Sequence, residues 1–180
     1  MSVIDNAELP QGSFYKFKIL ILEKFMKHTT LCYIEKDEAY LMLHRIKKEE
    51  DVNEGKWIGI GGRIEDGETP EQCLVREAME ETGLNLTSYQ YRGIVHFRSQ
   101  DYEDEDMHLF TADAFEGELT ECNEGILKWI DRDEIYDLPM WEGDKLFLGL
   151  IRSDVSFFNL TLKYKDDKLV SATLNGEKIF

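Results

Sequence analysis

From Thr29 onwards, apolar and polar residues follow the pattern of short β-strands separated by charged or polar turns. Two apolar runs, residues 31–34 and 39–43, flank the charged segment 35–38 and predict a β-hairpin. Further strands are expected over residues 57–62, 89–97, 107–115 and 126–130, and a final hairpin over residues 160–164 and 169–174. These segments predict strands for much of the chain.

One helix has start and stop signals at both ends and is expected to run from Pro70 to Thr82. Thr69 is a suitable N-cap, a proline occupies the first helical position, and Gln72 completes a Thr-x-x-Gln capping box. Gly83 is placed to end the helix in a left-handed conformation. A second helix is expected over residues 142–151.

The first 27 residues are expected to form an extension before a single domain of residues 28–180. Apolar residues recur there at helical spacing: Phe14, Phe17, Leu20 and Ile21. This spacing favours an amphipathic helix packed on the domain, with a membrane-surface helix as the alternative. No membrane span is expected, because the longest early apolar run, residues 19–22, is far below the roughly 20 residues required. The start also lacks the basic residues of a secretory signal.

The chain carries 37 Asp and Glu residues against 21 Lys and Arg, a formal net charge of −16 at pH 7. Such an acidic balance argues against binding to duplex nucleic acid, which requires a basic surface. An anionic substrate would be repelled unless cations intervene, so an acidic protein that acts on phosphates is expected to recruit metal. The simpler interpretation is that the charge only keeps the protein soluble.

The three cysteines, Cys32, Cys73 and Cys122, are widely spaced and form no C-x-x-C pair. Neither a disulfide framework nor a structural zinc site is therefore expected. A cytoplasmic location, where thiols stay reduced, fits this cysteine usage.

Three glutamates gather on one arc of the predicted helix 70–82: Glu77, Glu80 and Glu81. The apolar face beside them, expected to be buried, consists of Leu74, Val75, Ala78 and Met79. Carboxylates at i, i+3 and i+4 lie about 5–6 Å apart and repel one another, although Arg76 can pair with Glu80. Such a cluster suits magnesium or manganese, which prefer oxygen ligands. The alternative is a solvated acidic face.

The spacing around these glutamates is more specific. Gly62 is followed after five residues by Glu68, and after seven more by the run Arg76-Glu77-Ala78-Met79-Glu80-Glu81-Thr82-Gly83-Leu84. This pattern resembles the box of the Nudix hydrolases without a departure, and the flanking strands extend the likeness over most of residues 29–165. The resemblance implies an α/β fold, the Nudix α/β/α sandwich, with a mixed β-sheet between helices. It also implies hydrolysis of a nucleoside diphosphate linked to another group.

By position, the resemblance implies Glu77 and Glu81 as the main ligands of Mg²⁺, for which Mn²⁺ can substitute. Glu80 shares this metal-binding and catalytic role, Glu77 also serves as general base, and the carbonyl of Gly61 is the backbone ligand. The supporting positions of the box are Gly62, Glu68, Arg76 and Gly83, with Arg76 counted among the catalytic group. The metal would neutralise phosphate charge and acidify the attacking water.

Further positions resemble the MutT-type 8-oxo-dGTP diphosphatases. Glu124 stands five residues before Trp129, where that branch has a distal metal-binding carboxylate. The residues that the resemblance assigns to substrate binding are Arg45, Trp57, Ile58, Arg63, Phe97, Trp141, Asp144 and Phe147. Two positions depart from the mammalian enzyme: Ile58 replaces an asparagine that reads the base, and Gly143 replaces the first of two aspartates, leaving Asp144.

The resemblance implies cleavage of a purine nucleoside triphosphate such as 8-oxo-dGTP to the monophosphate and pyrophosphate. Other nucleotide substrates stay open. Tyr102 falls near a tyrosine of diadenosine polyphosphate hydrolases, and Ser99 falls near a proline of ADP-ribose enzymes. The alternatives from other classes are a nucleotide sensor without turnover, which usually loses a box glutamate, and a simple divalent-cation binder. Both a monomer and a homodimer are compatible with the sequence.

Overall fold

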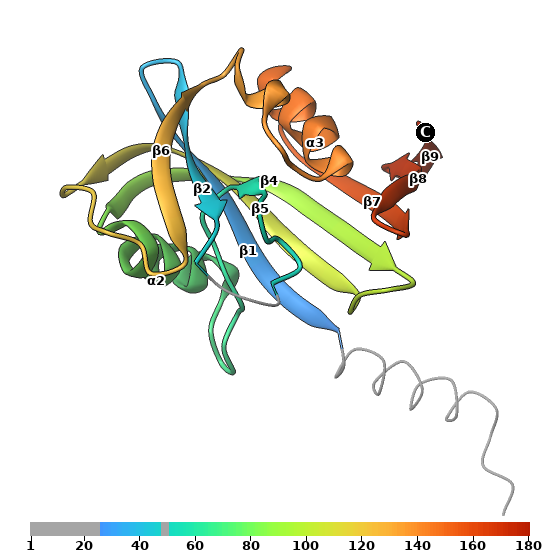
Figure 1. Ribbon diagram of the computed structural model, residues 1–180, viewed down its shortest axis with the longest axis horizontal. Helices are drawn as coiled ribbons and strands as arrows, with labels where there is room; N and C mark the ends of the chain where they lie inside the picture. Colours follow the sequence, from blue (N-terminus) through green and yellow to red (C-terminus); the bar gives the residue numbers. More distant parts are fainter. Residues whose placement is uncertain (1–25, 48–50) are drawn as a thin grey trace, which may run out of the picture.

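The computed structural model describes residues 26–47 and 51–180. These residues form a fold built on one mixed β-sheet (Figure 1). The elements in chain order are β1 (Lys27–Lys36), β2 (Ala39–Arg45), β3 (Trp57–Ile58), α2 (Pro70–Thr82), β4 (Asn85–Ser99), β5 (Glu105–Glu116), β6 (Gly125–Asp131), the 3₁₀ turn η1 (Ile135–Asp137), α3 (Glu142–Arg152), β7 (Phe158–Lys165), β8 (Lys168–Leu174) and β9 (Glu177–Lys178). The helix expected within residues 1–27 lies outside the described residues, apart from Lys27, which begins β1. No helix in the described part of the chain is long and apolar enough to cross a membrane.

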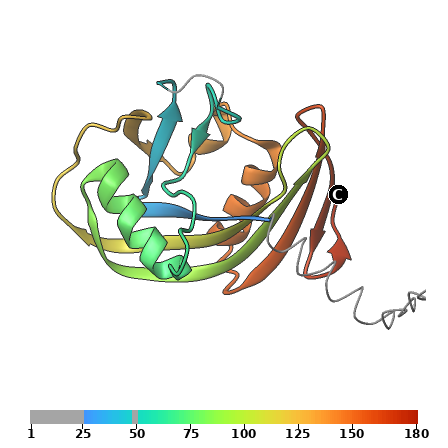
Figure 2. The same cartoon turned by 90° about the horizontal axis from the view of Figure 1, so that it is seen from below.

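The strands of the described residues are joined in the order β3-β2-β1-β5-β4-β7-β8-β9, and β6 pairs with β2. The pairs β1–β5 and β4–β7 are parallel, whereas the other neighbouring pairs are antiparallel. Figure 2 shows β4 and β5 as long curved strands that extend from the region of α2 to the C-terminal hairpin. The sheet is therefore mixed, as the resemblance implied.

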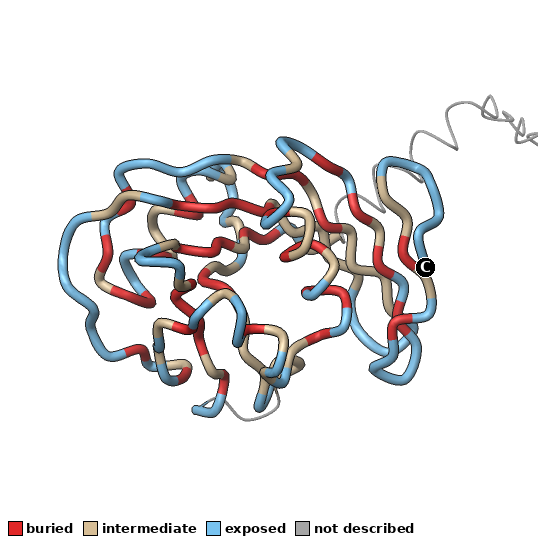
Figure 3. The backbone as a smooth tube through the Cα atoms, turned by 90° about the horizontal axis from the view of Figure 1, so that it is seen from above, coloured by how far each residue is buried: buried red, intermediate tan, exposed pale blue. Residues whose placement is uncertain are grey.

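Each face of the sheet buries its own apolar core, and each core includes one helix. On β1, Tyr33 points into the core that contains Phe147 of α3, whereas the next residue back, Cys32, points into the core that contains Leu74 of α2. This alternation follows from the two-residue period of a strand. In Figure 1, α2 and α3 lie on opposite sides of β1. Figure 3 shows buried residues along the strands and exposed residues at the turns. The two cores and the positions of the helices confirm the α/β/α arrangement.

The two helices predicted after residue 27 and both predicted hairpins are also confirmed. The side chain of Thr69 accepts a hydrogen bond from the backbone N–H of Gln72, whose own side chain bonds back to the N-cap, and Gly83 ends α2 at φ 76°. The first hairpin turns at Asp37 and Glu38, which both have positive φ and so match the twist of the flanking strands.

Several features differ from the sequence prediction. The strand predicted over residues 57–62 is shorter, because β3 covers only Trp57–Ile58. The 3₁₀ turn η1 and strand β9 were not predicted, although Asn175-Gly176 before β9 is a dipeptide typical of tight hairpins. The predicted buried face of α2 is wrong at Met79, whose side chain is 46% exposed. Glu81 is buried, with 6% exposure, because it lies on the same side of the helix as Leu74, which packs against the sheet.

Candidate active site

The glycine segment before α2 is held between β1 and the carboxylate helix. The backbone N–H of Thr30 on β1 donates to the carbonyl of Gly62 at 2.9 Å. The N–H of Gly61 donates to Oε2 of Glu81 on α2 at 3.0 Å. The two predicted glycines therefore lie where backbone and carboxylates meet.

At both glycines, another group lies where the first side-chain atom of a larger residue would be placed. A Cβ atom on Gly61 would lie 2.1 Å from the carbonyl oxygen of Thr30, and the residue has φ 154°. A Cβ atom on Gly62 would lie 2.4 Å from the carboxyl carbon of Glu77. The absence of a side chain at Gly61 lets the segment lie against the backbone of β1, and its absence at Gly62 lets the carboxylate of Glu77 reach the backbone of the segment.

Arg76 organises the glutamates around it. Its Nε and Nη2 atoms donate to the two carboxylate oxygens of Glu68, each at 2.9 Å. Its Nη1 atom donates to Glu77 at 2.7 Å and to Glu80 at 3.2 Å, which confirms the predicted pair at i+4. The bidentate bond with Arg76 lowers the pKa of Glu68 to about 2, so Glu68 stays charged and fixes the guanidinium group.

Glu81 has a different environment because it is buried. Burial raises its pKa to about 7, the bond from Gly61 opposes this, and the charge of Glu77 adds to it. A carboxylate held this way beside other carboxylates favours a nearby cation.

Arg45 at the end of β2 is a buried cation beside these carboxylates. Its Nη2 and Nε atoms lie 2.6 and 2.7 Å from Oδ2 of Asp51, and its Nη1 atom lies 4.0 Å from Glu81. Nη1 also bonds Glu124, the predicted distal ligand before β6. Arg45 therefore joins the loop after β2, helix α2 and Glu124 in one charged network.

The oxygen donors of this region fit a hard divalent cation. Four of the predicted ligands, Gly61, Glu77, Glu81 and Glu124, line one cavity. Glu80 does not line it, and its side chain is 60% exposed. Within residues 26–47 and 51–180, no group of three or more His, Cys, Asp or Glu side chains is already arranged as a metal cage. The donor chemistry thus suits Mg²⁺ or Mn²⁺.

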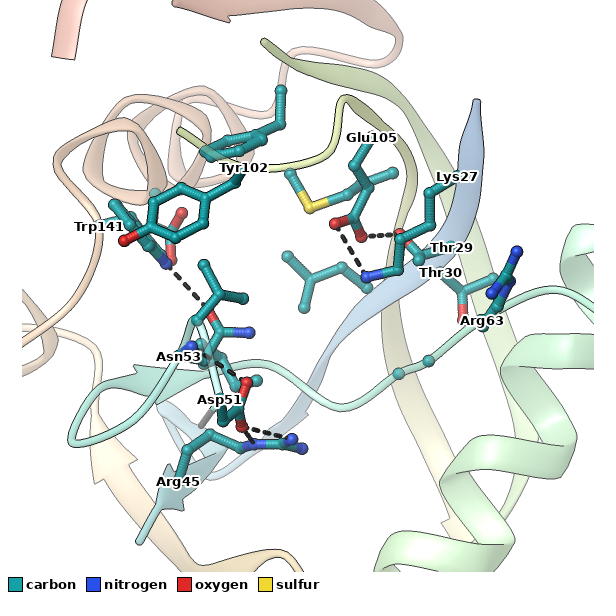
Figure 4. A pocket seen from close by; sticks show the side chains of 18 of the residues that line it. Lys27, Thr29, Thr30, Arg45, Asp51, Asn53, Arg63, Tyr102, Glu105 and Trp141 are labelled. Atoms are coloured by element: carbon teal, nitrogen blue, oxygen red, sulfur yellow. Dashed lines mark hydrogen bonds and ion pairs between the residues drawn. The ribbon is translucent and has the colours of Figure 1, made fainter. Parts of the chain in front are cut away.

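The cavity has a volume of about 530 Å³. Its aromatic wall consists of Phe97, Tyr102, Trp141 and Tyr164. Figure 4 shows Trp141 and Tyr102 on one side, Arg63 and helix α2 on the other, and Lys27 with Glu105 between them at the upper edge. The cavity therefore has a charged end at the glutamates and an aromatic end distant from them.

The aromatic end contains a buried acid. Burial raises the pKa of the Asp144 carboxyl to about 8, although Lys56 opposes the shift. Asp144 is therefore mostly protonated at neutral pH and can donate a hydrogen bond. Beside it, Nε1 of Trp141 donates to Oδ1 of Asn53 at 2.8 Å, and the ammonium of Lys56 lies 4.2 Å from the centre of the Trp141 ring. Trp141 is thereby fixed by two partners from the loop before β3.

The other predicted contact residues divide into two groups. Ile58, Arg63 and Phe97 line the cavity. Trp57 instead stacks on His44 with ring centres 4.5 Å apart, and Phe147 is fully buried in the core of α3. Because neither of these two side chains lines the cavity, the geometry gives no support to their predicted contact with substrate.

Sequence reasoning missed several lining residues: Lys27, Thr29, Asn53, Glu105 and Tyr164. Glu105 on β5 accepts hydrogen bonds from Lys27 at 3.2 Å and from Thr29 at 2.5 Å on β1. No local signal links Lys27 and Thr29 with Glu105, since β1 and β5 meet only through their parallel pairing.

A family model, the NUDIX domain, matches residues 26–150. This match covers more than half of the chain, and the box residues meet in one site as that family requires. The chain therefore belongs to the Nudix hydrolases.

Particular relatives are similar over different shares of the chain. The Nudix hydrolase YvcI of Bacillus subtilis is 29% identical over 161 residues, which are 86% of this chain and 98% of that protein. The oxidized purine nucleoside triphosphate hydrolase of Danio rerio is 38% identical over 105 residues, 58% of this chain and 67% of that protein. A solved MutT protein of Bacillus halodurans is 28% identical and superposes with a TM-score of 0.75, covering 84% of this chain and 99% of that one.

Proposed function

We propose that this Nudix hydrolase cleaves a purine nucleoside triphosphate, oxidised purines such as 8-oxo-dGTP included, to the monophosphate and pyrophosphate with Mg²⁺. The observation that carries the proposal is the single cavity of about 530 Å³ that is lined by both Glu77 and Glu81 and by Trp141 and Asp144. Its volume is within the roughly 300–1,000 Å³ of small-molecule pockets. The carboxylate end suits metal and phosphates, and the aromatic end suits a flat base.

The box residues are proposed to act on the phosphate chain. Mg²⁺ would be held by Glu77, Glu81 and the carbonyl of Gly61, with Glu124 as a distal ligand. When bound, the ion neutralises phosphate charge and acidifies the attacking water. Glu77 is the proposed base for that water, since its bond with Arg76 fixes one carboxylate oxygen.

The remaining lining residues are proposed to bind the substrate. Arg63 lies on the phosphate side of the cavity, where a guanidinium group can pair with phosphate oxygens. Trp141 and Phe97 offer apolar ring surfaces for the base. Asp144, neutral in the free protein, is proposed to donate a hydrogen bond to a ring acceptor of the purine. The name of the Danio rerio relative supports a purine triphosphate substrate.

We also propose that the enzyme acts in the cytoplasm. Cys32, Cys73 and Cys122 are all buried free thiols, and a reducing compartment preserves this state.

A dinucleoside polyphosphate is the second candidate substrate, favoured by Tyr102. This side chain lines the cavity, and its ring lies 6.1 Å from that of Trp141 in an edge-on arrangement. A second exposed ring could stack against a second base.

A substrate panel with product analysis tests the proposal. The panel consists of dGTP, 8-oxo-dGTP, dATP, dCTP, diadenosine tetraphosphate and ADP-ribose, with products separated by ion-exchange chromatography. We expect a purine monophosphate and pyrophosphate as products, no turnover after chelation, and recovery with Mg²⁺ or Mn²⁺. Faster cleavage of the diadenosine compound would favour the second candidate. Binding of a nucleotide without turnover would instead identify a sensor.

A further inference from the structure

The C-terminal hairpin β7–β8 follows the residues that the family model matches, yet it forms part of the cavity. Leu162 and Tyr164 on β7 both line it. They reach this position because β7 pairs in parallel with β4, with Leu162 opposite Phe97. Figure 2 shows the hairpin at one end of the sheet, beside α3. The hairpin is therefore placed to influence the aromatic end without touching the carboxylate helix.

Tyr164 contacts the segment that carries the predicted base-binding residues. Its hydroxyl accepts a hydrogen bond from the backbone N–H of Gly143 at 2.7 Å, and its ring lies 5.2 Å from Trp141 and 5.0 Å from Phe97. A Cβ atom on Gly143 would lie 2.7 Å from that hydroxyl and 2.4 Å from Leu162. The glycine at 143 and the tyrosine at 164 therefore fit together and fix the first turn of α3.

The turn of the hairpin bonds a second aromatic residue of the same wall, Tyr102. The hydroxyl of Tyr102, in the β4–β5 loop, donates to Oδ1 of Asp167 at 2.7 Å. The backbone N–H of Asp166 donates to the carboxylate of Asp101 at 2.9 Å in the same loop. The β4–β5 loop is thus bonded to both residues of the hairpin turn.

We propose that the β7–β8 hairpin is the specificity element of the nucleotide pocket, in which Tyr164 positions Trp141 and Asp144 and Asp167 positions Tyr102. Its role is selection of the base, because its contacts lie on the aromatic end and not among the glutamates. A pocket whose walls are held by fixed hydrogen bonds accepts fewer base shapes than one whose walls can move. The inference rests on the proposed function only in that the pocket receives a nucleobase.

The test compares Tyr164→Phe, which removes one hydroxyl, with the control Tyr89→Phe on a half-exposed tyrosine of β4 outside the cavity. For Tyr164→Phe we expect the KM of the preferred purine nucleotide to rise about tenfold and its preference over dCTP to fall by a similar factor. The value of kcat should stay within about twofold, since the carboxylate end is unaltered. The control should match the wild type in all three quantities.

A second set of variants tests the turn independently. Asp167→Gly removes the acceptor for Tyr102 and keeps the positive φ of 61°, whereas Asp167→Asn retains an acceptor oxygen. We expect Asp167→Gly to lower base preference and Asp167→Asn to restore most of it. Asp167 is exposed, so these variants still test the hairpin if Tyr164→Phe does not fold.

Three outcomes would overturn the inference. Unchanged KM and base preference in Tyr164→Phe and Asp167→Gly would show that the hairpin does not select the base. A fall in kcat at constant KM would place its effect at the carboxylate end. Absence of binding between the wild-type protein and non-hydrolysable α,β-imido triphosphates, measured by calorimetry, would remove the nucleotide pocket itself. Turnover of another nucleotide class instead of triphosphates would refute only the proposed function, and the same variants would then be compared on that nucleotide.

Discussion

The carboxylate of Glu77 occupies the space in which any side chain at position 62 would begin. A Cβ atom there would lie 2.4 Å from the Glu77 carboxyl carbon and 2.4 and 2.6 Å from its two oxygens. The tight fit of Gly62 and Glu77 therefore places the main predicted metal ligand against the backbone of the glycine segment.

Substitution Gly62→Ala should displace the Glu77 carboxylate and lower kcat by at least about tenfold, equivalent to about 1.4 kcal/mol in the barrier. The obstructing atoms are the end of a flexible side chain, so the free energy of unfolding should change by less than about 1 kcal/mol. Steady-state kinetics and thermal denaturation measure the two effects. The control is Gly149→Ala in α3, where nothing lies within 4 Å of the new methyl group and turnover should be unaffected. Wild-type kcat in Gly62→Ala would show that Glu77 tolerates displacement.

Glu77→Gln should abolish most turnover, with kcat lower by roughly 10²–10⁴, because the variant loses both a charged metal ligand and the proposed base. The fold should stay intact, since α2 keeps its Thr69 cap and Arg76 keeps its bidentate bond with Glu68. Circular dichroism and kinetics at saturating Mg²⁺ check both expectations. Glu71→Gln, an exposed change in the same helix, is the matched control. Near-full activity in Glu77→Gln would refute its assigned role.

Helix α2 could be predicted to the residue because its signals are local. Thr69, Gln72 and Gly83 satisfy the backbone groups at the two ends, whatever the helix packs against. The orientation of the helix was predicted less well. Glu81 was grouped with Glu77 and Glu80 on an acidic arc beside the apolar face, whereas the structure buries it on the side of the helix that carries Leu74. A buried carboxylate is a conflict between side-chain type and environment that is expected at a functional site.

The far wall of the cavity could not be read from the sequence. Lys27 and Glu105 meet through a parallel strand pair. Tyr164 lies on β7, which a second parallel pair places beside β4, and from there it contacts Gly143 of α3. Such pairings join residues far apart in the chain and leave no local pattern. Phe147 was assigned to the pocket but lies in the core of α3. The sequence alone does not distinguish an aromatic residue that lines a pocket from one that packs in the core.

Gly83→Ala should destabilise the protein by about 1–3 kcal/mol, because the residue has φ 76° and a Cβ atom would lie 2.8 Å from the carbonyl oxygen of Glu118. For a domain of this size the melting temperature should fall by roughly 2–10 °C. The variant Gly67→Ala separates backbone strain from steric crowding, since Gly67 has φ 86° but no atom lies within 4 Å of the position of an added Cβ atom. It should cost only about 1 kcal/mol. An equal loss in both variants would show that crowding at Gly83 contributes nothing.

Asp144→Asn should change the response of the enzyme to pH. Burial raises the pKa of Asp144 from 3.8 to about 8, so between about pH 4 and 8 the folded protein retains a proton that the unfolded chain has already released. The folded state binds more protons in that window, and the contribution of Asp144 to the free energy of unfolding must therefore fall as pH rises through it. The asparagine variant carries no such proton and should lack this part of the decline.

Above pH 8 the wild type should also lose affinity for its purine nucleotide, because the carboxyl group ceases to donate a hydrogen bond. Asp144→Asn keeps an N–H donor and should retain its affinity. Urea denaturation and KM measured from pH 5 to 9 test both effects, and parallel pH profiles of wild type and variant would contradict them.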